Sequence, residues 1–263
     1  VENIAGAAGA IGVQKMLSAA PDGHTLLLGS PMELVLTPLS IAAAKYKPED
    51  VQPLVRWGST SMVLLARKDL PANTVEELVA LAKTPGSKEM TFGSLGRGSL
   101  YHLVTARFQQ LSGTKMLEVP YKGAAPLVQD LIGGQIDIVF MPLAGNVPAL
   151  IKGGNVKPLG LAAASRHPQL SQIPLIKETK GMDDFVYGLW SGVQVSKNVP
   201  VAVQNQIHKA ANEALMLPEV RKAIEAQGST PANTSTLAEL TASYAQDIAR
   251  YQAIAKSINL QPE

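Results

Sequence analysis

Short runs of apolar residues alternate along the chain with stretches in which apolar residues recur every three or four positions. The first pattern is typical of buried strands and the second of amphipathic helices. Predicted strands occupy residues 24–29, 51–57, 62–66, 90–92, 116–119, 136–141, 156–162 and 187–195. Predicted helices occupy residues 13–20, 74–83, 100–112, 124–133, 147–152, 201–216, 219–226 and 237–257. Strands that alternate with helices in this way predict an α/β fold with mostly parallel sheets.

Three predicted helices close the chain after the α/β pattern is complete. We expect them to pack back on the first part of the chain, which gives two lobes. Lobe 1 is predicted to comprise residues 1–66 and 192–263, and lobe 2 residues 67–191, with two crossover strands between them. The ligand of such a fold is expected in the crevice faced by strand carboxyl ends and helix amino ends.

The amino-acid composition argues against several classes of partner and cofactor. The 263 residues are 46 % hydrophobic and 17 % charged, with a formal net charge of +2, 5 % aromatics and no cysteine. Scattered basic residues and sparse aromatics argue against nucleic acid as a partner. Disulfides and cysteine-ligated zinc are excluded. The four histidines show no metal-ligand spacing, so neither a metal nor another cofactor is expected.

No segment has the pattern of a transmembrane helix. The longest uncharged apolar span, residues 138–151, is short and is interrupted by Pro142, Gly145 and Pro148. Val1 and the two residues after it have the pattern of a strand end, so we expect further residues to precede it. Localisation therefore cannot be derived from the first residues, in which no signal peptide is evident.

The segment 92–103 has the pattern of a strand end, a glycine turn and the first turn of a helix. The start of a helix leaves free backbone N–H groups at the positive end of its dipole, which favours a bound anion. Ser94 and Ser99 add hydroxyl groups to this turn. A glycine turn that serves only tight packing is the alternative interpretation.

A second strand-to-helix turn, at residues 119–126, favours the ligand-binding interpretation, because its helix start is expected at the same sheet edge. Glycine-containing turns at residues 29–31 and 6–12 follow the same pattern in the first lobe. Several clusters of backbone N–H groups that face one crevice predict an anion site made largely of backbone.

Catalytic motifs are absent from the sequence: there is no Gly-x-Ser-x-Gly, His-Glu-x-x-His or Gly-Lys-Ser/Thr segment. Ser99 and His102 have the spacing of neighbours on one helix face and could form a nucleophile–base pair. No acidic residue that would orient His102 lies nearby in the sequence, which favours a packing role for His102.

Several motifs together resemble the periplasmic solute-binding proteins of tripartite tricarboxylate transporters, also called the Bug family. The matching positions are Val1, Glu2, Asn3, Gly6, Ala7, Gly9, Ile11 and Gly12; residues 20–23 with Thr25 and Leu26; residues 94–103; residues 120–123; residues 130–137; residues 217–220; and Gly228 with Pro231. The resemblance covers the whole chain.

The resemblance implies a two-lobed periplasmic-binding-protein fold of type II character, which closes over a small carboxylate. It also implies a periplasmic location, membrane transporter subunits as partners, and one more strand, glycine turn and helix before Val1. We expect a monomer that catalyses no reaction. The expected ligand-binding residues are Ser30, Pro31, Met32, Ser94, Gly96, Arg97, Gly98, Ser99, Tyr121, Gly123, Ala124, Met141 and Pro142.

Some positions leave alternatives open. Many family members carry a polar pair where this chain has Met141 and Pro142, so this segment supplies no partner for a ligand ammonium group. Arg97 could pair with a second carboxylate or could be an exposed loop residue. Tyr121 could flank an aromatic acid or anchor its own loop. A hydrolase that uses Ser99 and His102, or a carboxylate sensor, is the competing function.

Overall fold

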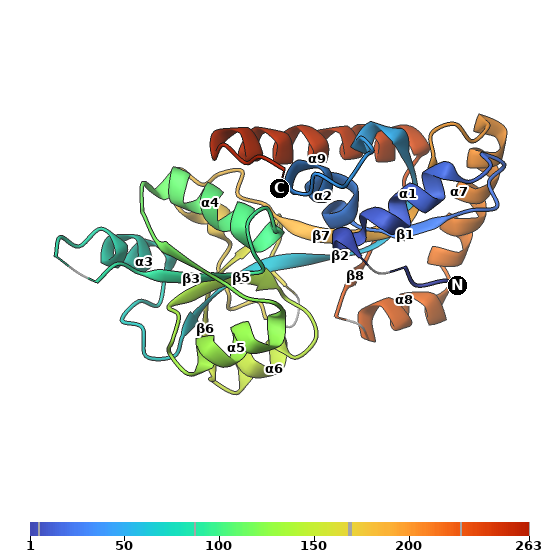
Figure 1. Cartoon of the computed structure of the whole chain (residues 1–263). Helices are drawn as coiled ribbons and strands as arrows, with labels where there is room; N and C mark the ends of the chain where they lie inside the picture. Colours follow the sequence, from blue (N-terminus) through green and yellow to red (C-terminus); the bar gives the residue numbers. More distant parts are fainter. Residues whose placement is uncertain (5, 87, 168–169, 227, 263) are drawn as a thin grey trace. The chain divides into compact units, whose positions relative to one another are not determined.

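The computed structural model describes residues 1–4, 6–86, 88–167, 170–226 and 228–262. The chain divides into two compact units (Figure 1). Unit 1 comprises Val1–Ser59 and Leu189–Glu263, and unit 2 comprises Thr60–Gly188. The observed boundaries fall after Ser59 and Gly188. The predicted boundaries fell after residues 66 and 191. The chain therefore passes from one unit to the other within β2 (Val51–Arg67) and at the start of β7 (Gly188–Ser196).

The strands of unit 1 have the order β1–β7–β2. β1 (Leu27–Gly29) is antiparallel to β7, and β8 (Thr230–Pro231) is antiparallel to β2 at Gly58 and Ser59. Its helical segments are α1 (Ala10–Ser18), Met32–Leu36, α2 (Thr37–Ser40), α7 (Val201–Leu215), α8 (Pro218–Ala226) and α9 (Leu237–Ser257).

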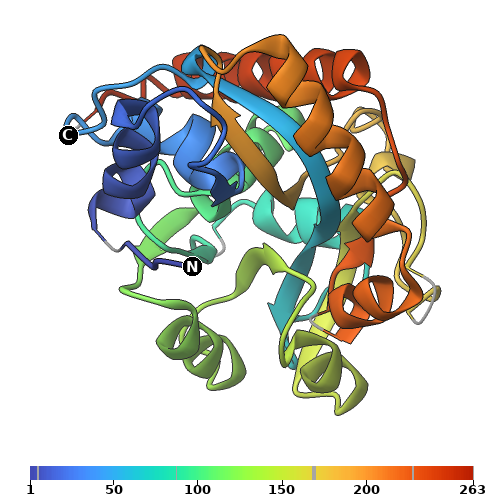
Figure 2. The ribbon, with the colours of Figure 1, turned by 90° about the vertical axis from the view of Figure 1, so that its right-hand side faces the viewer.

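Both faces of β2 are covered in unit 1. Leu54 and Val55 are neighbours in the strand, so their side chains point to opposite faces. Leu54 belongs to one buried cluster with Val195 and Val199, and Val55 to another with Leu215 and Ile224. Figure 2 shows the orange helix α7 beside the blue strand β2.

The sheet of unit 2 has the strand order β6–β2–β5–β3–β4. Its strands besides β2 are β3 (Thr91–Ser94), β4 (Leu117–Pro120), β5 (Ile138–Pro142) and β6 (Val156–Ala162). β3 is parallel to β4 and β5, whereas β2 is antiparallel to β5 and β6. The four strands β3, β4, β5 and β6 therefore run in one direction, as the predicted mostly parallel sheet requires, and β2 runs against them. A helix follows each of β3, β4 and β5, so that helical crossovers connect these four strands, whereas β2 enters from unit 1. In unit 1 the pairings of β1 with β7 and of β2 with β8 are antiparallel, so the prediction of mostly parallel strands does not extend to these pairs.

Helices cover both faces of this sheet. α4 (Leu100–Ser112) lies on one face, and α5 (Ala124–Ile132) and α6 (Val147–Lys152) lie on the other (Figure 1). Beneath α4, the rings of Phe108, Phe140 and Phe185 are packed with centroids 5.6 to 6.2 Å apart. All three rings are fully buried, so they anchor α4 to the sheet.

Most of the predicted elements are present in the structure, although β8 was not predicted and several limits differ. The strands predicted at 51–57 and 62–66 are one strand, because Gly58 and Ser59 pair with Pro231 and Thr230 and stay extended. The segments Met32–Leu36 and Thr37–Ser40 are helical, although no helix was predicted there. Thr74 caps α3 (Val75–Ala82) by accepting the N–H of Glu77, and the Glu77 carboxylate accepts the N–H of Asn73.

Candidate ligand-binding site

The predicted site segments of unit 2 lie at one edge of its sheet. Ser94 ends β3 and is in register with Pro120, which ends β4. The N–H of Tyr121 donates to the carbonyl oxygen of Ser94 at 2.9 Å, which joins the turn at residues 94–99 to that at residues 121–124. Met141 and Pro142 end β5, the other parallel neighbour of β3. The structure thus places the predicted site segments of this unit at the carboxyl ends of neighbouring parallel strands.

The turn at residues 94–99 is held by a buried serine. Ser94 is fully buried, and its hydroxyl donates to Oε1 of Glu118 at 2.5 Å. The same hydroxyl oxygen accepts the N–H of Gly96 at 2.9 Å. Gly96 has a φ of 96°, a left-handed conformation that glycine adopts without strain. Glu118 was not predicted, because it follows Ser94 by 24 positions and only strand pairing brings it close.

His102 supports the same turn from the first turn of α4. The N–H of Gly98 donates to Nδ1 of His102 at 3.2 Å, which requires Nδ1 to be unprotonated. Nε2 of His102 lies 3.8 Å from Oε2 of Glu118. Burial lowers the pKa of His102, the Glu118 carboxylate opposes this shift, and the charge of Arg97 adds to it. His102 is therefore a scaffold residue of the turn.

Ser99 caps α4 and does not bond to the imidazole ring in the described part of the chain. Its hydroxyl oxygen accepts the backbone N–H of His102 at 3.3 Å. The nucleophile–base hydrogen bond of a hydrolase is thus missing from the geometry, although Glu118 supplies the acidic neighbour that the sequence pattern did not reveal.

The amino end of α5 carries donors that no described side chain satisfies. Its N-cap is Gly123, which has no side-chain cap, and Pro126 has no N–H. Among the described residues, the N–H groups of Gly123, Ala124 and Ala125 have no hydrogen-bond partner. Ala124 and Ala125 are exposed. These donors, together with the helix dipole, form a position for an anion beside the turn at residues 94–99.

Tyr121 anchors its own loop, one of the two alternatives for this residue. Its hydroxyl donates to Oδ2 of Asp130 at 2.7 Å. Burial, and then the hydrogen bond to Asp130, raise the pKa of Tyr121 to about 12. Arg97 is exposed, and its contact with a ligand stays a prediction. Met141 is 4 % exposed and Pro142 half-buried, and their contact with a ligand likewise stays a prediction.

The predicted turn at residues 30–32 lies in unit 1 and already holds a carboxylate. The Ser30 N–H donates to Oε1 of Glu33, and the Ser30 hydroxyl donates to Oε2 of Glu33 at 2.8 Å. The Met32 N–H donates to the Ser30 hydroxyl oxygen at 3.2 Å. Glu33 was not among the predicted site residues, although its spacing from Ser30 is the Ser-x-x-Glu spacing at which a glutamate can accept the N–H of a serine.

Comparison with known proteins places this geometry in a family. The family model described as "Tripartite tricarboxylate transporter family receptor" matches residues 1–260. The chain belongs to this receptor family. Protein BugT of Bordetella pertussis is 34 % identical over 236 residues, which is 88 % of this chain and 71 % of BugT. A UPF0065 protein from the tcbD–tcbE intergenic region of Pseudomonas sp. is 30 % identical over 230 residues, covering 87 % of this chain and 67 % of that protein.

Solved structures agree with the family assignment. R. palustris Rpa4515 with adipate is 25 % identical, with a TM-score of 0.81 over 100 % of this chain and 87 % of that one. The periplasmic binding protein BugD is 27 % identical, with a TM-score of 0.78 over 100 % of this chain and 87 % of its own. This receptor is therefore a solute-binding protein with the periplasmic-binding-protein fold. In the described residues, no helix combines the length and the apolar character needed to cross a membrane.

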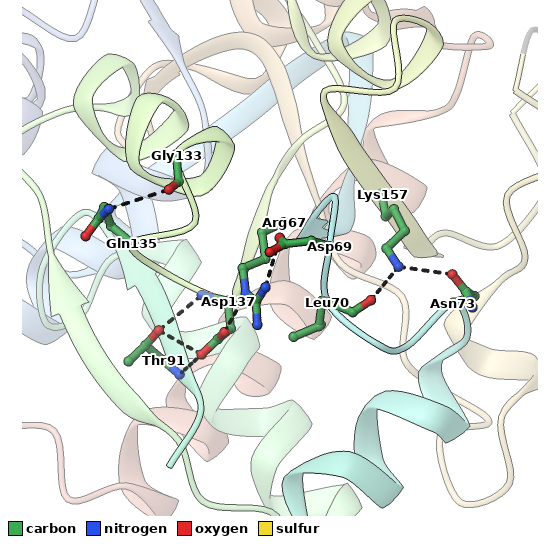
Figure 3. Close-up of polar contacts among 9 residues, drawn as sticks. All are labelled: Arg67, Asp69, Leu70, Asn73, Thr91, Gly133, Gln135, Asp137 and Lys157. Atoms are coloured by element: carbon green, nitrogen blue, oxygen red, sulfur yellow. Dashed lines mark hydrogen bonds and ion pairs between the residues drawn. The ribbon is translucent and has the colours of Figure 1, made fainter. Parts of the chain in front are cut away.

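Asp137, the last residue of the 130–137 segment, has a structural role. Oδ1 of Asp137 accepts from Nε of Arg67 at 2.9 Å, and Oδ2 accepts the N–H and the hydroxyl of Thr91 at 2.8 and 3.0 Å (Figure 3). Asp69 also pairs with Arg67, at 2.8 Å. The bond to Asp137 is the main cause of a raised pKa of Arg67.

This Asp137 network lies at the edge of the sheet where β3 and β5 begin, opposite to the site segments. A cavity of about 280 Å³ adjoins it, lined by Arg67, Leu70, Pro71, Leu81, Lys88, Glu89, Met90, Thr91, Gly134, Gln135 and Asp137. Asp137 joins Arg67 of β2 to Thr91 of β3, so the network stabilises the sheet of unit 2.

Proposed function

We propose that this receptor captures a small organic carboxylate in the periplasm and delivers it to the membrane subunits of a tripartite tricarboxylate-type transporter. Membership of the receptor family and the similarity to Rpa4515, which was solved with adipate, support this function. The observation that carries the proposal is the uncapped amino end of α5, with its exposed donors at Ala124 and Ala125.

The proposed carboxylate accepts the N–H groups of Gly123, Ala124 and Ala125. The turn at residues 94–99 lies next to this position, because the N–H of Tyr121 donates to the carbonyl oxygen of Ser94. Within that turn, the N–H groups of Gly96 and Gly98 are used by Ser94 and His102, so they set the shape of the turn rather than bind the anion. This proposal therefore shifts the anion contact from the glycine turn to the start of α5.

The remaining predicted residues complete the proposed contact set. Arg97, exposed in the same turn, is proposed to pair with a second carboxylate of the ligand. Ser30, Pro31 and Met32 are proposed contacts from unit 1, and Met141 and Pro142 from the end of β5. Binding makes and breaks no covalent bond. Ligand contacts instead stabilise the bound conformation of the receptor.

A thermal-shift screen tests the proposed function. The screen compares succinate, glutarate, adipate and benzoate with their methyl esters, which lack the charge. A ligand at a concentration of about 100 times its Kd adds roughly 2.7 kcal/mol to the free energy of unfolding, and this corresponds to a rise of several degrees in Tm. We expect at least one acid, and none of the esters, to raise Tm. Equal shifts with an acid and its ester, or no shift with any acid, would contradict the function.

A further inference from the structure

Arg97, the proposed partner of a second ligand carboxylate, lies between two glycines whose N–H groups are both held by side chains. The N–H of Gly96 donates to the hydroxyl oxygen of Ser94 at 2.9 Å, and the N–H of Gly98 donates to Nδ1 of His102 at 3.2 Å. Gly98 is buried, so bulk water does not replace this acceptor. Ser94 and His102 therefore fix the backbone on either side of Arg97.

One carboxylate joins these two side chains. Oε1 of Glu118 accepts the hydroxyl of Ser94 at 2.5 Å, and Oε2 of Glu118 lies 3.8 Å from Nε2 of His102. Glu118 belongs to β4, whereas Ser94 ends β3 and His102 lies in the first turn of α4. The three residues thus form one chain of polar contacts around the backbone of Arg97, and all of them belong to unit 2.

The contact with Gly98 requires a neutral imidazole ring. A protonated ring has donors at both nitrogens, so the buried N–H of Gly98 would face another donor and have no acceptor. The charged groups that face the ring are Glu118 from β4 and Arg97 from the turn. Burial lowers the pKa of His102, the charge of Glu118 raises it, and the charge of Arg97 lowers it further. The ring is therefore neutral at pH 7 and takes up a proton only below its ordinary pKa of about 6.5.

We infer that His102 makes the binding of dicarboxylates depend on pH. With a neutral ring, the turn holds Arg97 beside the carboxylate position at α5. A protonated ring releases Gly98, and the contact of Arg97 with the second carboxylate is lost. This inference rests on the proposed function, in which α5 binds one carboxylate and Arg97 a second one. His102 is a positioning residue, since it acts through the backbone of Arg97 rather than by contact with the ligand.

The direction of the pH effect follows from the charges around the ring. Protonation of a lone histidine beside an anion position would attract the anion and strengthen binding at low pH. In this receptor the added charge lies 3.8 Å from the carboxylate of Glu118, which balances it. The rearranged turn then has the larger effect, and the affinity for a dicarboxylate falls as His102 takes up its proton. By reciprocity, the binding of a dicarboxylate releases protons from His102.

Calorimetric titration at pH 7 and pH 5 tests the inference. The probes are succinate, glutarate and adipate, with butyrate, pentanoate and hexanoate as monocarboxylates of the same chain length. Between the two pH values we expect the Kd of a bound dicarboxylate to rise at least about fivefold more in the unmodified receptor than in His102→Asn, whose Oδ1 atom accepts the N–H of Gly98 without titrating. Protonation of the acids themselves is common to both proteins and cancels in this comparison.

Two controls accompany this titration. The monocarboxylates are expected to show the same change of Kd with pH in both proteins, because they make no contact with Arg97. The variant His24→Asn, at an exposed position of unit 1, is expected to behave like the unmodified receptor. A dicarboxylate Kd that changes equally with pH in the unmodified receptor and in His102→Asn would overturn the inference.

Glu118→Gln separates titration from packing. The glutamine amide still accepts the hydroxyl of Ser94, but the charge that raises the pKa of His102 is gone. We therefore expect the loss of dicarboxylate affinity to move to a lower pH in this variant. A pH profile that stays in place in Glu118→Gln, or an affinity that rises at pH 5 only when His102 is present, would overturn the inference.

Hydrogen exchange of the ligand-free protein gives a second readout. The protection of the Gly98 amide, relative to its intrinsic exchange rate at each pH, is expected to fall between pH 7 and pH 5 in the unmodified receptor and to stay constant in His102→Asn. Constant protection in the unmodified receptor would overturn the inference. Should no acid bind at either pH, the proposed carboxylate function fails, and the exchange of Gly98 alone decides the role of His102.

Discussion

The backbone N–H of Gly98 donates to Nδ1 of His102 at 3.2 Å, so an imidazole ring determines the shape of a glycine turn. Gly98 is buried, and its φ of 83° places it in the left-handed region. Replacing the ring with an apolar side chain leaves the buried N–H of Gly98 without an acceptor. Such a loss costs about 1–3 kcal/mol.

We therefore predict that His102→Leu lowers the free energy of unfolding by about 1–3 kcal/mol. His102→Asn is the matched control, because its Oδ1 atom can accept the N–H of Gly98, and we expect it to lose less than half as much. Denaturant unfolding measures both. Equal losses in the two variants would show that the ring acts by packing alone.

The protonation of His102 makes the stability of the protein depend on pH. Burial, as the largest cause, lowers the pKa of His102 below its ordinary value of about 6.5. A lowered pKa in the folded state means that the unfolded chain binds the proton more readily, so stability is present above about pH 6.5 and is lost as the pH falls through the lowered value. We predict that the unmodified protein loses more stability between pH 7 and pH 5 than His102→Asn does. Identical pH profiles in urea titrations would contradict this role.

A substitution of Arg97 tests whether this residue makes the receptor prefer dicarboxylates to monocarboxylates. Arg97 is exposed in the turn at residues 94–99, beside the proposed anion position. We predict that Arg97→Ala weakens the binding of dicarboxylates by at least about tenfold, as expected for loss of a charge-assisted pair, while monocarboxylates bind nearly unchanged. Arg107→Ala, on α4, serves as the control. Equal weakening of mono- and dicarboxylates in calorimetry would remove the assignment.

Local sequence patterns predicted most of the fold. α4, α6, β6 and α9 lie at their predicted residues, since glycines and apolar periodicity mark their limits. The continuity of β2 could not be predicted, because Gly58 and Ser59 resemble a break until their pairing with β8 is known. The direction of β2 could not be predicted for a similar reason, since β2 pairs with β5 and β6, which lie far along the chain.

The sequence predicted the backbone turns of the candidate site but not the acidic side chains that hold them. Glycine, serine and proline are typical of strand-to-helix turns, so the turns at residues 94–99 and 121–124 could be predicted. Glu118 reaches Ser94 only through the pairing of β3 with β4, which no local pattern encodes. The contact of Glu33 with Ser30 could have been predicted, because the two residues have the Ser-x-x-Glu spacing.

The central claim is that a ligand carboxylate binds the amino end of α5. A substitution at Gly123, the N-cap residue of this helix, tests the claim directly. Gly123 has an extended backbone with a φ of 179°, and a Cβ atom added there meets nothing within 4 Å. A Cβ atom can therefore be added at Gly123 without a clash or backbone strain. An aspartate at this N-cap position can accept the N–H of Ala125 with its own carboxylate, which would occupy the proposed anion position. Compared with alanine at the same position, it stabilises the helix by about 0.5–2 kcal/mol.

The decisive measurement is calorimetric titration of Gly123→Asp and Gly123→Ala with the acid that gives the largest thermal shift. We predict that Gly123→Asp unfolds at a higher temperature than Gly123→Ala and binds the acid at least about tenfold more weakly, while Gly123→Ala binds it like the unmodified protein. Undiminished binding by a folded Gly123→Asp variant would show that the carboxylate is held elsewhere.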